Sequence, residues 1–297
     1  MSFVGGGSDL PVFYRRHGGA VVSTTINRYV YITVNAKFDQ RIRVSYSRTE
    51  EVKSVDKIQH PLVREALKCV QIEGGVEITS IADIPAKGTG LGSSSAFTVG
   101  LLNALHAYAE RHAAAEQLAR ECCEIEIERC GEPIGKQDQY ASAYGGLNYI
   151  QFLPNDSVIV EPIICKRDTI ARLEENLLVF YTGLTRSAST ILRRQQASVR
   201  AGKKKQEALK KMVALAGDLK HALQKNQPDA FGEIIHENWL LKRGLAEGIS
   251  SPRIDDWYAK ARAAGAIGGK RCGRRLPAVR RNRSRGHGGQ VECSTQR

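Results

Sequence analysis

The amino-acid sequence predicts an α+β fold, as one large domain or as two lobes, and two observations carry the α+β prediction. In the first half of the chain, several stretches alternate apolar and polar residues as half-buried strands do, and one leads through a glycine-rich turn into an apolar helix. In the second half, from residue 188 onward, apolar residues recur mostly at helical spacing. We place the boundary between the two lobes near residues 165–168.

Each element follows from its local pattern. β-branched and alternating residues predict strands at residues 21–34, 41–46, 76–81, 145–152, 157–165 and 177–181. Helical periodicity predicts helices at residues 60–70, 93–111, 114–130, 188–199, 205–225, 228–244 and 254–264. We expect the first two strands to form a hairpin around a turn at 37–40, the strand at 157–165 to pair with its predecessor, and the strand at 177–181 to be buried.

The composition, with 42% hydrophobic and 25% charged residues, is ordinary for a soluble globular protein. No apolar run approaches the roughly 20 residues of a membrane span, and the first residues lack the pattern of a signal peptide. The seven cysteines have no paired spacing, which indicates a reducing cytoplasm and argues against a disulfide framework or a zinc site. We therefore expect a cytoplasmic protein without a membrane partner.

The net charge of +13 is unevenly distributed along the chain. Residues 271–297 hold eight arginines and one glutamate, which leaves only +6 on the first 270 residues. The basic tail contains no Phe, Tyr or Trp on which bases could stack, so an RNA-binding role is disfavoured. The modest positive charge of the body is compatible with anionic phosphate substrates.

The most informative stretch runs from Pro85 to Ala96 and reads Pro-Ala-Lys-Gly-Thr-Gly-Leu-Gly-Ser-Ser-Ser-Ala. Glycines allow backbone N–H groups to approach a ligand, and a helix N-terminus adds unpaired donors and partial positive charge. This combination favours a phosphate site. It is not a Walker A loop, because Lys87 precedes the glycines instead of following them. The plainer alternative is a glycine turn with a serine cap and no ligand.

This stretch resembles the second motif of the GHMP kinases, a family that includes galactokinase, homoserine kinase and mevalonate kinase. The resemblance implies an N-lobe like domain 2 of ribosomal protein S5 and a ferredoxin-like C-lobe. It also implies that the loop wraps the phosphates of ATP. The residues that would bind ATP are Pro85, Gly88, Gly90, Leu91, Gly92, Ser93, Ser94 and Ser95.

Two further segments extend the resemblance. The stretch at 131–139, Gly-Glu-Pro-Ile-Gly-Lys-Gln-Asp-Gln, is similar to a galactokinase segment and implies that Asp138 is the catalytic carboxylate. Glu126 falls where the family has a Mg²⁺-binding glutamate, so the resemblance implies that Ser94 and Glu126 hold Mg²⁺. The stretch at 5–10, Gly-Gly-Gly-Ser-Asp-Leu, is similar to a sugar-binding segment. It implies that Gly6, Gly7 and Asp9 bind the substrate.

Within the family, residues 2–270 read most like the D-glycero-D-manno-heptose 7-phosphate kinases. The resemblance implies an ATP-dependent kinase that phosphorylates the anomeric C1 hydroxyl of that sugar, for nucleotide-heptose and surface polysaccharide biosynthesis. Its lobes would be 1–166 and 167–270. Another sugar-1-kinase of the fucokinase or galactokinase type is an alternative, and so is an impaired product that only binds nucleotide. The sequence says nothing about the oligomeric state.

The candidate residues have plainer interpretations too. Asp138 could cap the helix expected at 140–144, Glu126 could form a surface ion pair, and Asp9 could serve a turn. Arg186 could contact a substrate phosphate or be an ordinary surface arginine. We expect His236 and Trp239 to lie on a helix and to serve in packing, and we expect the same of Cys122 and Cys123.

Both ends depart from the family pattern. Relatives begin with an Arg-x-Pro-x-Arg segment on an edge strand, whereas this chain starts Met-Ser-Phe-Val. After Lys270 the expected glycine-rich turn and apolar strand are replaced by an arginine-rich sequence. Read one base later, the codons from residue 271 permit five small residues, then Phe-Leu-Leu-Phe. We therefore interpret residues 271–297 as a frameshifted, disordered tail without a packed strand, and the C-lobe as incomplete.

Overall fold

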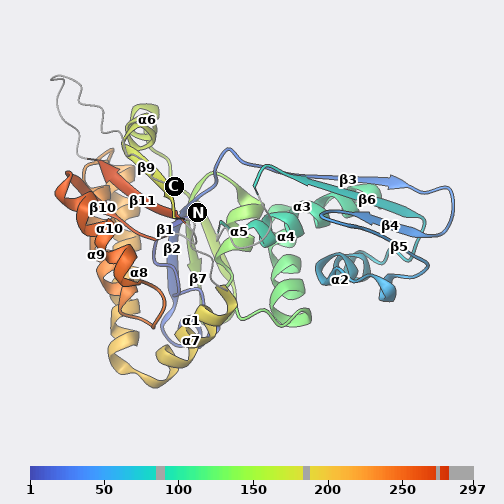
Figure 1. The fold of residues 1–297 in the computed structure, drawn as a ribbon, viewed down its shortest axis with the longest axis horizontal. Helices are drawn as coiled ribbons and strands as arrows, with labels where there is room; N and C mark the ends of the chain where they lie inside the picture. Colours follow the sequence, from blue (N-terminus) through green and yellow to red (C-terminus); the bar gives the residue numbers. More distant parts are fainter. Residues whose placement is uncertain (85–90, 183–187, 272–274, 281–297) are drawn as a thin grey trace.

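The computed structural model describes residues 1–84, 91–182, 188–271 and 275–280, whose strands form three sheets (Figure 1). The central sheet has the order β1-β2-β7-β8 and is antiparallel throughout. Its strands are β1 (Ser2–Val4), β2 (Gly19–Thr24), β7 (Leu147–Phe152) and β8 (Val158–Pro162). Because helices cover both faces, β2 is buried almost throughout: Ala20 and Val22 face one layer and Val21 the other.

The second sheet extends to one side of the molecule (Figure 1). Its order is β3 (Val30–Ala36), β6 (Val76–Ala82), β4 (Ile42–Ser45) and β5 (Thr49–Val52). Helices α2 (Pro61–Val70) and α3 (Ser93–Tyr108) pack on one face and share its apolar core. The other face exposes Tyr31 and Ile81, which lie opposite each other in the β3–β6 ladder. A short 3₁₀ turn, η1 (Val55–Lys57), precedes α2.

The predicted strand over 21–34 and its hairpin with 41–46 are both wrong. The stretch is divided between β2 and β3, which belong to different sheets. β3 and β4 do not pair with each other, because β6 lies between them, antiparallel to β3 and parallel to β4. Each strand alternates as expected, but local alternation does not say which distant strand completes its ladder.

The helices between the sheets position the candidate site. They are α1 (Pro11–His17), α4 (Ala115–Cys123), the π-helical segment η2 (Glu124–Arg129) and α5 (Gln137–Tyr144). The predicted helix at 114–130 is therefore α4 with its last turns wound as a π-helix, a variant that is frequent at functional sites. α1 was not predicted; it is short and begins with Pro11 in its first turn.

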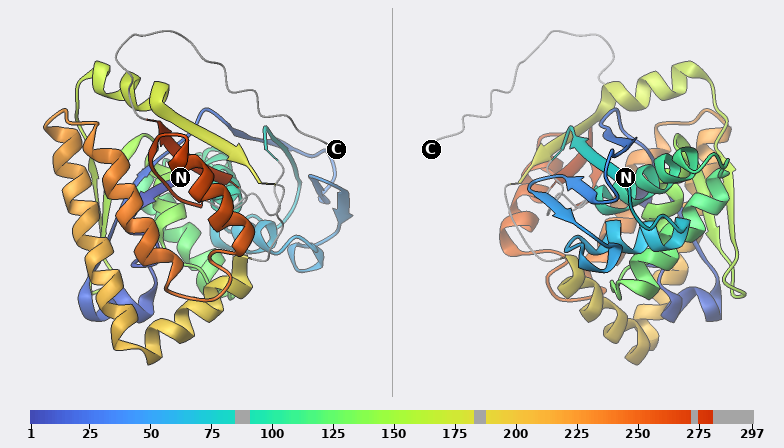
Figure 2. Two further views of the ribbon diagram at one scale, coloured as in Figure 1. Left: turned by 60° about the vertical axis from the view of Figure 1, so that its left-hand side comes forward. Right: turned by 90° about the vertical axis from the view of Figure 1, so that its right-hand side faces the viewer.

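The chain from residue 167 onward, called the C-lobe below, holds a helical layer and a three-stranded sheet of order β10-β11-β9. Its elements are α6 (Arg167–Asn176), β9 (Leu177–Tyr181), α7 (Ala188–Ala201), α8 (Lys203–Gln224), α9 (Ala230–Arg243), α10 (Pro252–Ala263), β10 (Ala266–Gly269) and β11 (Arg275–Arg280). The four helices predicted after residue 188 are confirmed within a few residues, whereas α6 was not predicted. In Figure 2 the long helices α8 and α9 run side by side. Phe3 and Val22 of the central sheet pack against them, with Leu219 of α8 among their neighbours.

Two expectations about the C-lobe sheet are corrected. Residues 275–280 form a strand, β11, which lies between β9 and β10 and pairs antiparallel with both, so the tail is not without a packed strand. β9 is not buried: Leu178, Val179 and Phe180 are each close to half exposed. Residues 272–274 and 281–297 lie outside the described part. None of the helices described is long and apolar enough to cross a membrane.

Candidate functional site

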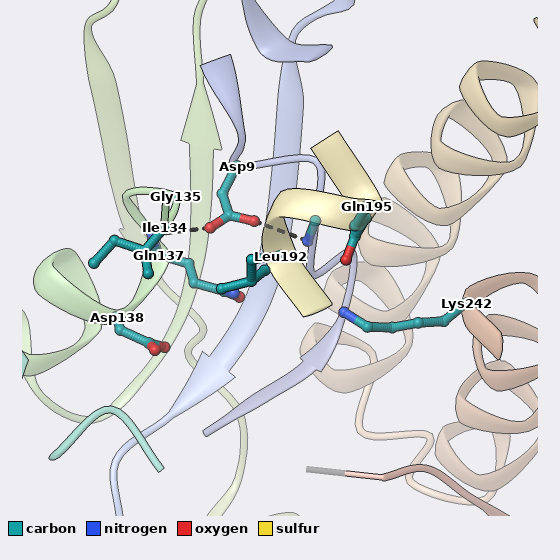
Figure 3. Close-up of a pocket in the computed structure, with 9 residues that line it drawn as sticks. Asp9, Ile134, Gly135, Gln137, Asp138, Leu192, Gln195 and Lys242 are labelled. Atoms are coloured by element: carbon teal, nitrogen blue, oxygen red, sulfur yellow. Dashed lines mark hydrogen bonds between the residues drawn. The ribbon is translucent and has the colours of Figure 1, made fainter. Parts of the chain in front are cut away.

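A pocket with about 350 Å³ of empty volume, counted with its open mouth, lies between the two lobes (Figure 3). The lining residues are Gly7, Asp9, Ile134, Gly135, Gln137, Asp138, Leu192, Gln195 and Lys242. Two carboxylates on its wall, Asp9 and Asp138, are both residues singled out in the sequence. The structure therefore brings the predicted substrate segment and the predicted catalytic segment together, although they are far apart in the chain.

Asp9 is 2% exposed and is held by backbone amides. The N–H of Gly7 donates to its Oδ1 at 2.8 Å, and the N–H of Gln137 donates to Oδ2 at 3.4 Å. Burial raises the pKa of Asp9, and the negative charge of Asp138 raises it further, whereas the bond from Gly7 and the charge of Lys242 lower it. The turn interpretation of Asp9 is thus only part of its role, because the same carboxylate also binds the start of α5.

Asp138 is the second residue of α5 and makes no cap. The N-cap residue of α5 is Lys136, and no side chain caps this helix. Gly92, which precedes α3 with φ at +73°, lies against Asp138: a β-carbon there would stand 3.3 Å from Cγ of the carboxylate. Burial raises the pKa of Asp138, and the positive charges of the terminal amino group, Lys242 and Lys270 oppose that rise. The glycine turn and the carboxylate are therefore direct neighbours.

Glu126 lies in the π-helical segment and is 1% exposed, so the surface ion-pair interpretation is wrong. Ser95 Oγ and Gln139 Nε2 each donate to Glu126 Oε2 at 2.7 Å. Burial raises its pKa, and hydrogen bonds from Ser95, Ser94 and Gln139 oppose the rise. These donors tie the first turn of α3 to the glutamate, so Ser94 and Glu126, for which the resemblance implies Mg²⁺ binding, lie next to each other.

The donor set at Glu126 fits a magnesium ion. Its hydrogen-bond donors among the described residues are all neutral, so none of them balances the charge of this buried carboxylate. Ser94, beside it, is exposed and presents a hydroxyl oxygen. Mg²⁺ prefers oxygen ligands and is commonly held by one or two carboxylates together with substrate phosphates. The described residues contain no cluster of three or more His, Cys, Asp or Glu that could hold a metal ion.

The remaining predicted residues are placed as follows. Leu91, Gly92 and the serines at 93–95 form the entry to α3, and β6 precedes this stretch, so the predicted strand and helix are confirmed. Pro85, Gly88 and Gly90 lie outside the described residues, and so does Arg186. Gly6 lies beside the pocket and accepts a 2.8 Å hydrogen bond at its carbonyl oxygen from Lys242 Nζ.

The packing interpretations also hold. Trp239 is fully buried in the core formed by α1, α8, α9 and α10. His236 shares a 2.6 Å hydrogen bond between its Nδ1 and the Tyr258 hydroxyl. Cys122 and Cys123 are buried free thiols in apolar cores, and burial raises the pKa of both.

Sequence reasoning missed three polar residues of the pocket. Gln137 stands next to the predicted Asp138, but Gln195 and Lys242 come from helices α7 and α9 of the C-lobe. Nothing in their local pattern marks them, because each occupies an ordinary position in an amphipathic helix. Only the docking of the lobes brings them to the pocket.

Known proteins resemble this chain in sequence and in fold. The family model for the N-terminal domain of GHMP kinases matches residues 60–146, and the model for their C-terminal domain matches residues 219–273. A D-glycero-alpha-D-manno-heptose 7-phosphate kinase of Campylobacter jejuni is 27% identical over 285 residues, which cover 92% of this chain and 84% of that protein. A bifunctional fucokinase/GDP-fucose pyrophosphorylase of Arabidopsis thaliana is 24% identical over 87% of this chain and 26% of its own length.

Among solved structures, a D-glycero-D-manno-heptose 1-phosphate kinase from Bacteroides thetaiotaomicron superposes with a TM-score of 0.76. It is 29% identical and the match covers 94% of this chain and 85% of that one. A Lactococcus lactis galactokinase in complex with galactose superposes with a TM-score of 0.74 at 16% identity, over 94% of this chain and 82% of that one, and so shares the fold.

Proposed function

The chain belongs to the GHMP kinases, and from that premise we propose that it transfers the γ-phosphoryl group of ATP to the anomeric C1 hydroxyl of D-glycero-D-manno-heptose 7-phosphate. One observation carries the proposal: Gly92 of the glycine loop lies against Asp138, on the wall of a pocket that also contains Asp9. A phosphate donor bound at the loop would thus meet an acceptor held in the pocket.

Phosphoryl transfer requires positioning and neutralisation of charge more than covalent chemistry. The N-terminus of α3 supplies the backbone donors and partial positive charge for the ATP phosphates. Ser94 and Glu126 would hold Mg²⁺, which neutralises phosphate charge when bound. Ser94, which is exposed, would offer the ion a hydroxyl oxygen, and the buried carboxylate of Glu126 would offer it a negative charge.

The acceptor side follows from the two carboxylates. Asp9 has its oxygens fixed by backbone amides, so it is preorganised to accept hydrogen bonds from sugar hydroxyls. Asp138 would orient the attacking hydroxyl and accept its proton as the bond between that oxygen and the γ-phosphorus forms and the bond to ADP breaks. Such general-base assistance contributes roughly 10²–10⁴-fold to the rate.

A heptose acceptor is supported by two relatives that match nearly the whole chain, one named a heptose 7-phosphate kinase and the other a heptose 1-phosphate kinase. The 7-phosphate acceptor rests on the first of these names. A fucokinase- or galactokinase-type acceptor is the second candidate. The pocket itself favours a polyhydroxylated acceptor over an apolar one, because five of its nine lining residues carry a carboxylate, a carboxamide or an ammonium group.

The test is a phosphorylation assay with MgATP and a panel of acceptors: D-glycero-D-manno-heptose 7-phosphate, L-fucose, D-galactose and mevalonate. Phosphorus NMR of the product distinguishes an anomeric phosphate from one on another hydroxyl. We expect the heptose phosphate to give the highest kcat/KM and an anomeric product. A higher kcat/KM for fucose or galactose would instead identify the chain as a kinase of the fucokinase or galactokinase type. ATP binding without turnover on any acceptor would support the interpretation as an impaired nucleotide binder.

A further inference from the structure

The C-lobe closes the pocket opposite the two carboxylates. Helix α7 contributes Gln195 and helix α9 contributes Lys242, and Figure 3 shows both reaching toward the N-lobe side chains of the pocket. The mechanism above uses neither residue. Gln195 and Lys242 are therefore polar pocket residues that have no part in the mechanism above.

Gln195 is 2% exposed, and its side-chain nitrogen has no hydrogen-bond partner among the described residues. A buried amide donor without an acceptor is unfavourable in a folded protein. The carboxamide packs directly on the main chain of the predicted substrate segment, since a β-carbon on Gly7 would stand 2.2 Å from Gln195 Nε2. Gly7 also has φ at +104°, a conformation that favours glycine. The segment is thus shaped to admit this carboxamide.

Gln137 presents the complementary group from the N-lobe. Its side-chain oxygen is buried and has no partner among the described residues. A β-carbon on Gly6 would lie 3.4 Å from this oxygen and 3.0 Å from Lys242 Nζ. Gln137 and Gln195 therefore flank adjacent glycines, one with an unused acceptor and the other with an unused donor, and both line the same pocket.

A hydroxyl group donates one hydrogen bond and accepts others, so a sugar ring satisfies both kinds of unused group at once. We propose that the carboxamides of Gln195 and Gln137 hydrogen-bond ring hydroxyls of the acceptor and determine which sugar stereochemistry is accepted. Gln195 is then a specificity residue supplied by the C-lobe. The inference rests on the proposed function and deepens it by naming the residues that recognise the acceptor.

The first test is Gln195→Met, which removes the carboxamide at similar volume. We expect the KM for the accepted sugar to rise at least about tenfold, because a lost hydrogen bond to a desolvated partner costs roughly this factor. The kcat and the KM for ATP should change by less than about twofold, since the residue recognises the acceptor ring and not the reacting atoms.

Gln196→Met is the matched control. Gln196 is the next residue on α7, donates at 3.3 Å to the carbonyl oxygen of Pro133 and does not line the pocket. It should leave the acceptor KM unchanged. Equal thermal unfolding temperatures for the two variants establish that both fold.

The second test uses monodeoxy analogues of the accepted sugar. The wild type should discriminate against the analogue that lacks the hydroxyl bound by Gln195, and Gln195→Met should lose that discrimination while keeping it at other positions. Gln137→Met should lose discrimination at a different hydroxyl. An unchanged acceptor KM, or unchanged discrimination in Gln195→Met, overturns the inference and leaves the kinase assignment intact.

If the wild type phosphorylates none of the sugars, the proposed function fails. Calorimetric binding of the same sugars to the wild type and to Gln195→Met then decides the inference separately. Tighter binding to the wild type supports it. No binding, or equal binding to both proteins, overturns it.

Discussion

Gly135 lies so close to Asp9 that a β-carbon on it would stand 2.0 Å from Oδ2 and 2.5 Å from Cγ of the carboxylate. No side chain can occupy that position unless Asp9 moves. The contact joins the segment before α5 to the predicted substrate segment, and it explains why a glycine is needed three residues before Asp138. The carboxylate is thereby held between Gly7 and the start of α5.

We therefore predict that Gly135→Ala impairs acceptor binding. The added methyl group displaces the Asp9 carboxylate from its backbone donors, so the KM for the acceptor should rise by about tenfold or more, as for loss of a charge-assisted hydrogen bond. The affinity for ATP should stay near normal. Steady-state kinetics with each substrate varied in turn provide the measurement.

Gly217→Ala is the control for this variant, because nothing lies within 4 Å of a β-carbon at that position in α8. It should leave the kinetics unchanged and raise stability by about 0.5–1 kcal/mol, the usual gain for alanine over glycine in a helix. A wild-type acceptor KM in Gly135→Ala would show that Asp9 does not contact the substrate.

We predict that Asp138→Asn lowers kcat at least about tenfold, and by up to the roughly 10²–10⁴-fold that a general base contributes. The affinity for ATP should change little. The substitution should also raise stability at neutral pH. Burial raises the pKa of Asp138, so the folded state binds its proton more tightly than the unfolded state does. Stability is then lost as pH rises through the window between the unfolded and folded pKa values, and the asparagine variant avoids that loss.

The corresponding measurement is the unfolding temperature of both proteins from acidic to neutral pH. The variant should be more stable by about 2 °C or more at neutral pH, with the difference closing at acidic pH. Retention of more than about a tenth of the wild-type kcat would instead indicate that Asp138 has a structural role.

We predict that Lys242 determines the pH below which kcat/KM falls. Its positive charge lowers the pKa of both Asp138 and Asp9 against the effect of burial. With the Asp138 carboxylate as the working form, activity falls as pH drops through its pKa. In Lys242→Met that pKa rises, so the loss of kcat/KM should begin at a higher pH than in the wild type.

Lys242→Arg keeps the positive charge. Its kcat/KM should therefore begin to fall at the same acidic pH as in the wild type, even if its kcat/KM at the optimum is lower. Lys210→Met serves as a surface control, since Lys210 pairs with Glu207 on α8 away from the pocket. A profile in Lys242→Met that is unchanged, or shifted toward lower pH, contradicts the electrostatic assignment.

Residues 275–280 should matter to stability, contrary to the expectation from the sequence that the tail is disordered and lacks a packed strand. β11 lies between β9 and β10, so truncation after Lys270 removes the strand that joins the other two. We expect the unfolding temperature to fall by about 5 °C or more, whereas truncation after Arg280 should change it little. Equal stability of both truncated proteins and the full chain would show that β11 contributes nothing.

We also propose that the reading frame is displaced after Lys270. Read one base later, the codons for residues 276–279 permit Phe-Leu-Leu-Phe, and these positions fall inside β11. In the present chain Pro277 lies in β11, the middle strand of the sheet, opposite Val179 of β9. A residue without a backbone N–H is unfavourable in a middle strand. A frame-corrected protein should therefore unfold at a higher temperature and show higher kinase activity, which a side-by-side comparison of the two proteins measures.

The chain by itself determined the parts of the site that depend on local geometry. The glycine turn before Ser93, the start of α3 and the entry of α5 near Asp138 follow from glycine freedom and helix N-termini, which act over a few residues. The helices after residue 188 follow from apolar periodicity for the same reason. Glu126 was found by its distance from a motif, although its burial against Ser95 and Gln139 was not apparent.

Only the tertiary structure decided which of these segments meet. β6 rather than β4 pairs with β3, Gln195 and Lys242 join the pocket from the other lobe, and a proline-containing stretch becomes the middle strand of a sheet. Strand partners and lobe contacts are selected by the summed burial of apolar faces and by backbone hydrogen bonds between distant segments. These long-range contributions depend on segments that are far apart in the chain. A local sequence pattern therefore identifies the glycine loop and Asp138, but not Gln195 and Lys242 on the opposite wall of the pocket.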